Sequence, residues 1–120
     1  MTDVDPTGRP GRLSATSTVV DGIHVISLAG EIDRDSAEVL RDALPRPDTP
    51  RLRVVVDLEQ VTFLDSTGIN LFISTHNALA QNGGWVRLAA PTTSVLRVLQ
   101  IVGIDTVIDC CPTLRQALST

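Results

Sequence analysis

The chain has 120 residues, of which 42% are hydrophobic and 20% are charged, and this balance is typical of one compact domain. Its net charge of −4 and its few aromatic residues, Phe63, Phe72 and Trp85, argue against direct binding of nucleic acid, which relies on basic surfaces and stacking rings. No apolar run approaches the roughly 18 residues of a membrane-spanning helix, so the sequence predicts no membrane partner.

The first 12 residues are polar, are rich in proline and glycine, and lack the apolar core of a secretory signal. The sequence therefore predicts a flexible leader over residues 1–12, one domain over residues 13–120 and a cytoplasmic location. Cys110 and Cys111 are adjacent, and such a pair can neither join distant segments nor supply the four ligands of a structural zinc site. A strained disulfide and simple apolar packing are the alternatives for this pair. We expect no metal site and no cofactor.

Two strands open the predicted domain. Residues 13–20 alternate in polarity with a period of two, as a half-buried strand does. Asp21 and Gly22 then form a hairpin signal, because glycine accepts the positive φ angle of a tight turn. Residues 23–29 should return antiparallel to the first strand, and a loop is expected over residues 30–34.

A short helix should follow this loop. Asp35 and Glu38 have the spacing of a capping box, with Asp35 as the N-cap and Glu38 at the third helical position. Four apolar residues supply the buried face of this helix: Val39, Leu40, Ala43 and Leu44. Three prolines then end the helix and impose an extended connection: Pro45, Pro47 and Pro50.

A buried strand and a long helix form the centre of the domain. Residues 51–58 are predicted as a central strand, because the valines at 54–56 are too continuously apolar for a sheet with one wet face. An amphipathic helix should begin around Ser66 and stop at Gly83 and Gly84. Its apolar arc comprises Ile69, Phe72, Ile73, His76, Leu79 and Ala80.

The remaining elements complete an α/β domain. The sequence predicts a strand over residues 85–90, a helix over residues 92–102, a short strand over residues 106–109 and a final helix over residues 113–118. Crossover helices make all strands after the first mutually parallel. The expected fold is thus a single α/β domain with a mixed sheet of about five strands, the first antiparallel to the second, and about four helices.

One segment, residues 57–68, carries candidate chemistry. A helix that begins at Ser66 places this hydroxyl beside backbone N–H groups and the positive end of the helix dipole, where a phosphate is well accommodated. Asp65 can hold the loop, and Gly68 leaves room for the close approach of a partner. The other interpretation is an ordinary helix cap formed by Asp65, Ser66 and Thr67.

Three motifs in this order resemble the anti-sigma factor antagonist family of STAS domains. They are Leu28-Ala29-Gly30-Glu31-Ile32-Asp33, Phe63-Leu64-Asp65-Ser66-Thr67-Gly68-Ile69, and Val95-Leu96-Arg97-Val98-Leu99 leading to Gly103-Ile104. The resemblance covers roughly residues 13–118 and implies that residues 13–120 form a STAS domain.

The resemblance also implies a function. In this family a small α/β domain binds an anti-sigma factor that is also a serine kinase, and so releases a sigma factor. Ser66 matches the serine that the kinase phosphorylates, and a PP2C-type serine phosphatase is the implied partner that reverses the modification. Asp65, Thr67 and Gly68 complete the matching turn, and Asp33 lies in the loop expected beside it. These residues are the implied partner-binding site.

Asn70 belongs to the same implied site but departs from the family pattern, in which many members carry a second glycine. On a helix that begins near Ser66, residue 70 lies about one turn further on the same face. We therefore expect Asn70 to be exposed and to influence partner selectivity. A neutral surface residue is the alternative.

An enzyme and a STAS module with another client are the alternatives to this function. An enzyme with Ser66 as nucleophile fits poorly, because neither His24 nor His76 is expected within reach as a base and no nucleophile-elbow motif is present. The sequence therefore predicts no catalytic activity. A STAS module could instead serve another client, as a signalling scaffold or a nucleotide sensor, and nucleotide binding without a kinase would distinguish that role.

Overall fold

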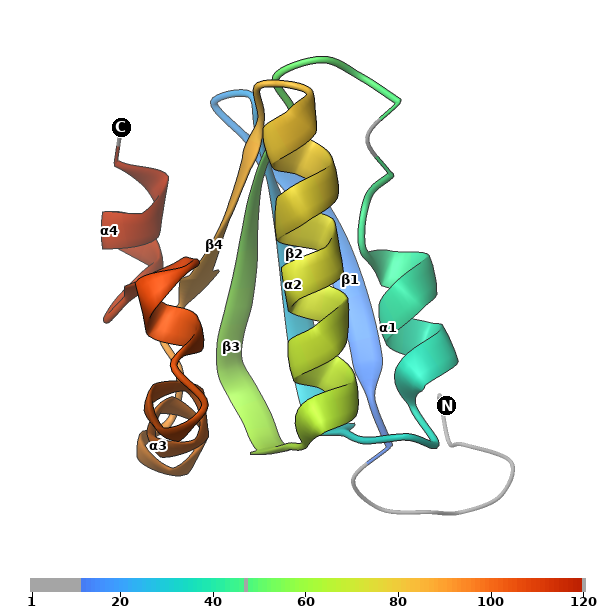
Figure 1. The fold of residues 1–120 in the computed structure, drawn as a ribbon, viewed down its shortest axis with the longest axis vertical. Coiled ribbons are helices and arrows are strands. Elements are labelled where there is room, and N and C mark those ends of the chain that lie inside the picture. Colours follow the sequence, from blue (N-terminus) through green and yellow to red (C-terminus); the bar gives the residue numbers. More distant parts are fainter. Residues whose placement is uncertain (1–11, 47, 120) are drawn as a thin grey trace.

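The structure is a computed structural model that describes residues 12–46 and 48–119 (Figure 1). The predicted leader, apart from Arg12, lies outside the described residues, and so does Pro47. One sheet has the strand order β1-β2-β3-β4-β5. The first pair is antiparallel and the later pairs are parallel, as predicted. The strands are β1 (Ser14–Val20), β2 (Ile23–Ile32), β3 (Arg53–Leu64), β4 (Trp85–Ala89) and β5 (Asp109–Cys111).

Helices cover both faces of the sheet (Figure 1). In the described residues they are α1 (Ala37–Ala43), α2 (Ser66–Gln81), α3 (Thr93–Ile101), the 3₁₀ turn η1 (Ile104–Thr106) and α4 (Leu114–Leu118). The first three pack on one face, where Leu40, Phe72 and Leu99 join the main core. On the other face α4 contributes Ala117 to a smaller cluster. Within the described residues, no helix combines the length and apolar character needed to cross a membrane.

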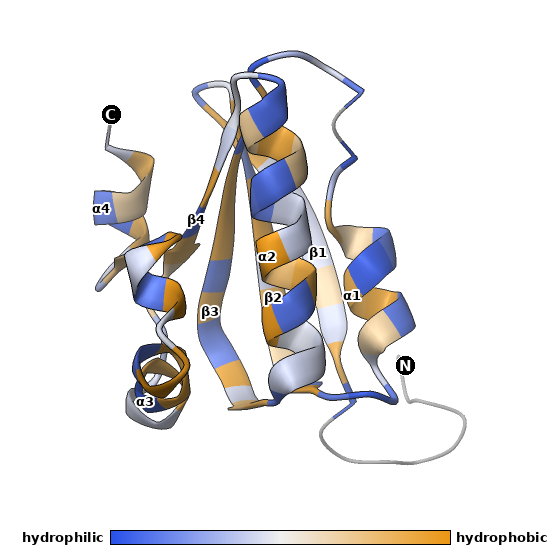
Figure 2. Cartoon of the chain, viewed as in Figure 1, coloured by the Kyte–Doolittle hydropathy of each residue, from blue (hydrophilic) through white to orange (hydrophobic). Residues whose placement is uncertain are grey.

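The valines at 54–56 form the centre of the molecule, as predicted. All three are fully buried. Val54 and Val56 belong to the main core, whereas Val55 points to the cluster beneath α4. Figure 2 shows hydrophobic colouring on the upper part of β3, beside α2. A strand covered on both faces explains the continuous apolar run in the sequence.

β2 and β3 extend further than predicted. The register between them shifts twice around Gly30, which has a φ of 111° and lets the strand bulge instead of ending. β2 therefore continues to Ile32, which pairs with Leu64, and the loop predicted to start at residue 30 begins only after residue 32. The strand end predicted at residue 58 is also wrong. β4 stops opposite Asp57, and the polar residues that follow on β3 lie exposed beside β2.

The predicted capping box of the first helix is not formed. α1 begins at Ala37, so Ser36 occupies the N-cap position and Asp35 precedes it. The Ser36 side chain makes no capping bond to the helix, because its hydroxyl is engaged with the residues at the end of β2. The chain entering α1 is therefore held by the bonds of Ser36 to the end of β2 and the loop after it.

The two outer strands also differ from the prediction. Residues 104–106 form a 3₁₀ turn, and the last strand lies at residues 109–111 and not at 106–109. β1 is an edge strand in which Ala15 alone is partly covered, so it is more exposed than a half-buried strand. Both differences depend on the neighbours that each strand has in the sheet. The polarity pattern of a short sequence segment does not contain that information.

α2 lies close to the ends of β2 and β3 because it carries a glycine there. Gly68 is buried, and a Cβ atom at this position would collide with Ile32 and come within 2.6 Å of Leu64 Cδ1. The missing side chain serves this internal packing, so the prediction that it leaves room for a partner is wrong. Of the predicted apolar arc, Ile69, Phe72 and Leu79 are buried, while Ala80 is exposed.

We expect Gly68→Ala to destabilise the protein, although alanine is the better helix former. Helix propensity favours alanine by about 1 kcal/mol, whereas overpacking in a filled core costs about 1–3 kcal/mol. Urea unfolding of both proteins measures the difference in the free energy of unfolding. Ser74→Ala, at an exposed position of α2, is the control that should lose no stability. A Gly68→Ala variant more stable than the wild type would contradict the tight packing.

Candidate functional site

The predicted site residues meet at the carboxyl ends of β2 and β3. Ile32 and Leu64 are paired in register, so the residues that follow them, Asp33 and Asp65, leave the sheet next to each other. The backbone N–H of Asp65 donates to the carbonyl of Ile32 at 3.1 Å. This bond joins the loop after β2 to the start of α2.

Asp65 caps α2 and leaves Ser66 exposed. The Asp65 carboxylate accepts a hydrogen bond from the N–H of Thr67 at 2.9 Å, and its carbonyl accepts one from Ile69 at 3.3 Å. Ser66 is the first residue of α2, and its hydroxyl makes no hydrogen bond to any residue that the structure describes. Asp65 therefore caps the helix, and the Ser66 hydroxyl is available to another molecule.

The three remaining predicted site residues differ in accessibility. Asn70 is exposed and lies one turn after Ser66 on α2, as expected. Thr67 is half-buried, and Gly68 faces the core. Of these three, Asn70 presents its side chain most fully to solvent.

Sequence reasoning overlooked Ser36, which positions Asp33. The Ser36 hydroxyl donates to the carbonyl of Glu31 at 3.0 Å and accepts from the N–H of Asp33 at 2.9 Å. The Asp33 carboxylate in turn accepts from the N–H of Ser36 at 3.0 Å. These reciprocal bonds hold the Asp33 side chain in a fixed place beside the start of α2. The spacing of an Asp and a Ser three residues apart after a strand is the signal that could have indicated this loop.

Phe63, near the end of β3, is a second residue that sequence reasoning overlooked. Its side chain is 48% exposed, and it pairs in register with the exposed Glu31. An aromatic residue directly after the polar Thr62 is a visible sequence signal, but its exposure follows from the absence of β4 at this level of the sheet. Because its neighbour Leu64 joins the core beneath α2, the exposed ring of Phe63 lies on the opposite face of the sheet.

The histidines lie away from Ser66. His24 is half-buried near the start of β2, at the end of the strand far from Asp33. His76 is about three turns along α2 from Ser66. Its Nδ1 is buried and has no hydrogen-bond partner in the described residues. Neither imidazole is placed to take a proton from the Ser66 hydroxyl.

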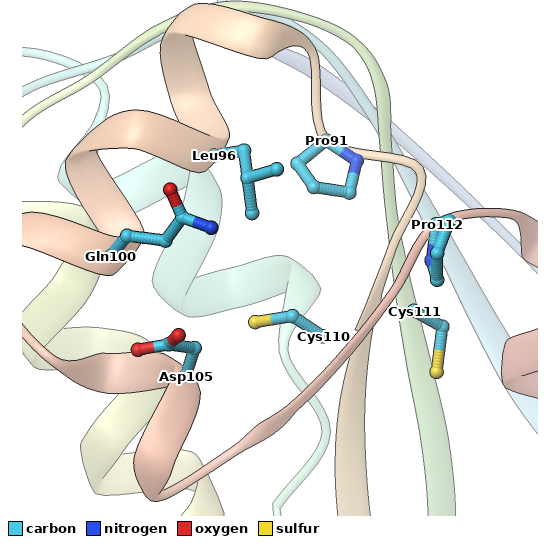
Figure 3. Close-up of a pocket in the computed structure, with 7 residues that line it drawn as sticks. All are labelled: Pro91, Leu96, Gln100, Asp105, Cys110, Cys111 and Pro112. Atoms are coloured by element: carbon cyan, nitrogen blue, oxygen red, sulfur yellow. The ribbon is translucent and has the colours of Figure 1, made fainter.

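A pocket of about 410 Å³ lies between α3, η1 and β5, and Figure 3 shows its lining residues. Cys110 contacts the main core, whereas Cys111 packs against the cluster beneath α4. Their side chains lie on opposite sides of β5, as neighbours on a strand do (Figure 3). Both thiols are free, and apolar packing is the interpretation that fits.

Burial, assisted by the carboxylate of Asp105, raises the pKa of the Cys110 thiol to about 11. The pKa of Cys111 is also raised by burial, with Arg87 acting in the opposite direction. Among the described residues, no three His, Cys, Asp or Glu side chains are grouped to hold a metal ion.

Comparison with known proteins places these features in a family context. The profile of the STAS domain matches residues 14–117. The anti-sigma-B factor antagonist of Bacillus subtilis is 32% identical over 84 residues, which cover 70% of this chain and 77% of the relative. The anti-sigma-B factor antagonist of Staphylococcus aureus is 31% identical over 94 residues, covering 77% of this chain and 86% of the relative.

Solved structures show the same fold. An anti-sigma factor antagonist from Mycobacterium paratuberculosis is 32% identical and has a TM-score of 0.77, covering 92% of this chain and 94% of that chain. A STAS-domain protein from Planctomyces limnophilus, at 23% identity, has a TM-score of 0.73 over 87% of this chain and 94% of that chain, and supports the fold alone.

We expect the alkylation rate of Cys110 to keep rising towards pH 11, because the thiolate is the reactive form and its pKa lies well above the ordinary value of 9.0. Iodoacetamide modification of the Cys111→Ser variant, followed by mass spectrometry across pH, measures this rate. Urea should remove the effect. A rate that levels off near pH 9 in folded protein would contradict the burial of this thiol.

The same shift affects stability. The thiol of the unfolded chain ionises at its ordinary pKa, whereas the folded protein holds Cys110 protonated up to about pH 11. The stabilising contribution is therefore complete below the unfolded value and is lost as pH rises towards the folded value. Cys110→Ser should remove this part of the pH dependence.

Proposed function

The chain belongs to the STAS domain family, and from that membership we propose that it acts as an anti-sigma factor antagonist. The observation that carries this proposal is the name shared by relatives at 31% and 32% identity over most of the chain. The protein would bind an anti-sigma factor and so release a sigma factor in the cytoplasm. In this role it is a regulatory protein and not an enzyme.

Ser66 is the proposed site of phosphorylation. Its exposed hydroxyl lies at the first position of α2. The first backbone amides of a helix have no partner within the helix. Asp65 accepts hydrogen bonds from the amides of Thr67 and Ile69. A phosphoryl group adds a charge of about −1.5 to −2 at neutral pH. The N-terminus of a helix accommodates such an anion, so the fold should persist.

The proposed switch acts through the surface. Unmodified, the surface at Ser66 presents a small hydroxyl close to the carboxylates of Asp33 and Asp65. Phosphorylation would add negative charge and bulk beside carboxylates that are already present, and a partner fitted to the unmodified surface would be repelled. The change is local, because Ser36 and Asp65 hold the two loops independently of Ser66.

Three partners follow from this proposal. The anti-sigma factor would also be the serine kinase that modifies Ser66, with ATP as its substrate. A PP2C-type serine phosphatase would remove the phosphate and restore binding. The chain itself would need no cofactor, because the kinase and phosphatase supply the chemistry.

We expect incubation with the cognate kinase and ATP to place phosphate on Ser66, and Ser66→Ala to abolish it. Because Asp65 provides the cap, Ser66→Ala should change the free energy of unfolding by less than about 0.5 kcal/mol. Ser66→Asp should weaken binding of the anti-sigma factor in calorimetric titration, whereas Ser74→Asp, on an exposed position of the same helix, should not. Phosphate on Thr67 with Ser66 unmodified would overturn the assignment.

Asn70 offers a separate test of partner selectivity. Asn70→Gly should weaken binding to the native anti-sigma factor and reduce the discrimination among related ones, because a side chain matched to the partner is removed. Asn77→Gly, exposed on the same helix, reproduces the cost of about 1 kcal/mol for a glycine in a helix and is the control. Titration of both variants against a small panel of anti-sigma factors measures the effect. Identical affinity profiles would leave Asn70 without a role in recognition.

A further inference from the structure

The two edges of the sheet are protected very differently. β5 has three residues, includes the charged Asp109 and is followed by Pro112. β1 has seven residues, contains neither charge nor proline, and pairs with β2 without a bulge. Short length, charge, proline and bulges are the features that keep an edge strand from pairing with another chain. β1 has none of them, although every second residue directs its N–H and C=O away from β2.

Only the first part of β1 is covered by the helical layer. Leu13 is buried and Ala15 is packed against the core, where α1 contacts β1. Val19 lies on the same face as Ala15 but is 59% exposed, and Val20 on the opposite face is 38% exposed. The end of β1 that α1 does not cover therefore carries apolar surface. Figure 2 shows β1 as largely pale, without a charged segment along the strand.

We propose that β1 pairs antiparallel with β1 of a second copy of this chain, about a two-fold axis near Ser17. This register places Val19 of each copy opposite Ala15 of the other, next to the helix that covers Ala15. Each α1 would thus adjoin the exposed Val19 of the other copy. The two sheets would become one continuous sheet with the helices α1 to α3 of both copies on the same face.

The charges at the ends of the strand favour this orientation. Arg12 precedes β1 and Asp21 follows it, with no charged residue between them. Antiparallel pairing near Ser17 brings Arg12 of one copy close to Asp21 of the other at both ends. Parallel pairing would bring like charges together, which is unfavourable. β2 separates β1 from β3, the strand that leads to Ser66, so this pairing does not depend on the proposed function.

Light scattering coupled to size-exclusion chromatography of the full chain tests the proposal. We expect the mass to approach twice the 12.8 kDa of one chain as the concentration rises. Ser17→Lys places two positive charges near the axis and should leave a folded monomer, as judged by circular dichroism. Ser74→Lys makes the same substitution at an exposed helical position and should dimerise like the wild type.

A mixing experiment tests the register. Ser17→Glu alone should also be monomeric, and an equal mixture of Ser17→Lys and Ser17→Glu should recover the dimer, because opposite charges then meet near the axis. A wild-type protein that stays monomeric at all concentrations overturns the proposal. A folded Ser17→Lys variant that dimerises like the wild type, or a mixture that stays monomeric, overturns it as well.

Discussion

The close contact between the first turn of α2 and the ends of β2 and β3 determines the geometry of the whole site. Gly68 allows the helix to approach Ile32 and Leu64, and the bond from Asp65 N–H to the Ile32 carbonyl fixes the loop between them. Because these contacts are internal, the core sets the position of Ser66 at the start of α2. Under the proposed function, modification of Ser66 would change the surface without changing the fold.

The site divides its tasks among neighbouring residues. Asp65 satisfies the helix terminus, Ser36 holds the loop after β2, and Ser66 makes no bond that the described residues depend on. Modification of a residue that makes a structural bond would cost stability. In the proposed switch, the separation of the two tasks would keep the modified and unmodified forms close in folding free energy.

Local patterns in the sequence were sufficient for the scaffold. The apolar period and the two glycines at its end predicted α2, and the continuous valines predicted a strand buried on both faces. The motif also placed Ser66 correctly at the start of the helix. These features depend on residues close in the chain, so periodicity and capping rules describe them well.

The errors have a common physical origin in contacts between distant residues. Gly30 resembles a strand end, and only its pairing with β3 turns it into a bulge. The exposure of β1 and Phe63 depends on where neighbouring strands stop, and the role of Gly68 depends on two strands that precede it. The interaction of Ser36 with Asp33 replaced a capping box that was locally plausible.

The unequal lengths of β3 and β4 have a mechanical consequence. Beyond Asp57, residues 58–64 of β3 pair with β2 alone. From Gly30 onwards β2 has no partner in β1, so the strand ends before Ser66 form a two-stranded ribbon beyond a broader base. Two-stranded ribbons twist more strongly than wide sheets. One face of this ribbon is fixed by Ile32, Val61 and Leu64, which are buried in the main core. Its other face, where Phe63 is exposed, has no such packing to preserve. Evolution can therefore vary that face without disturbing the base.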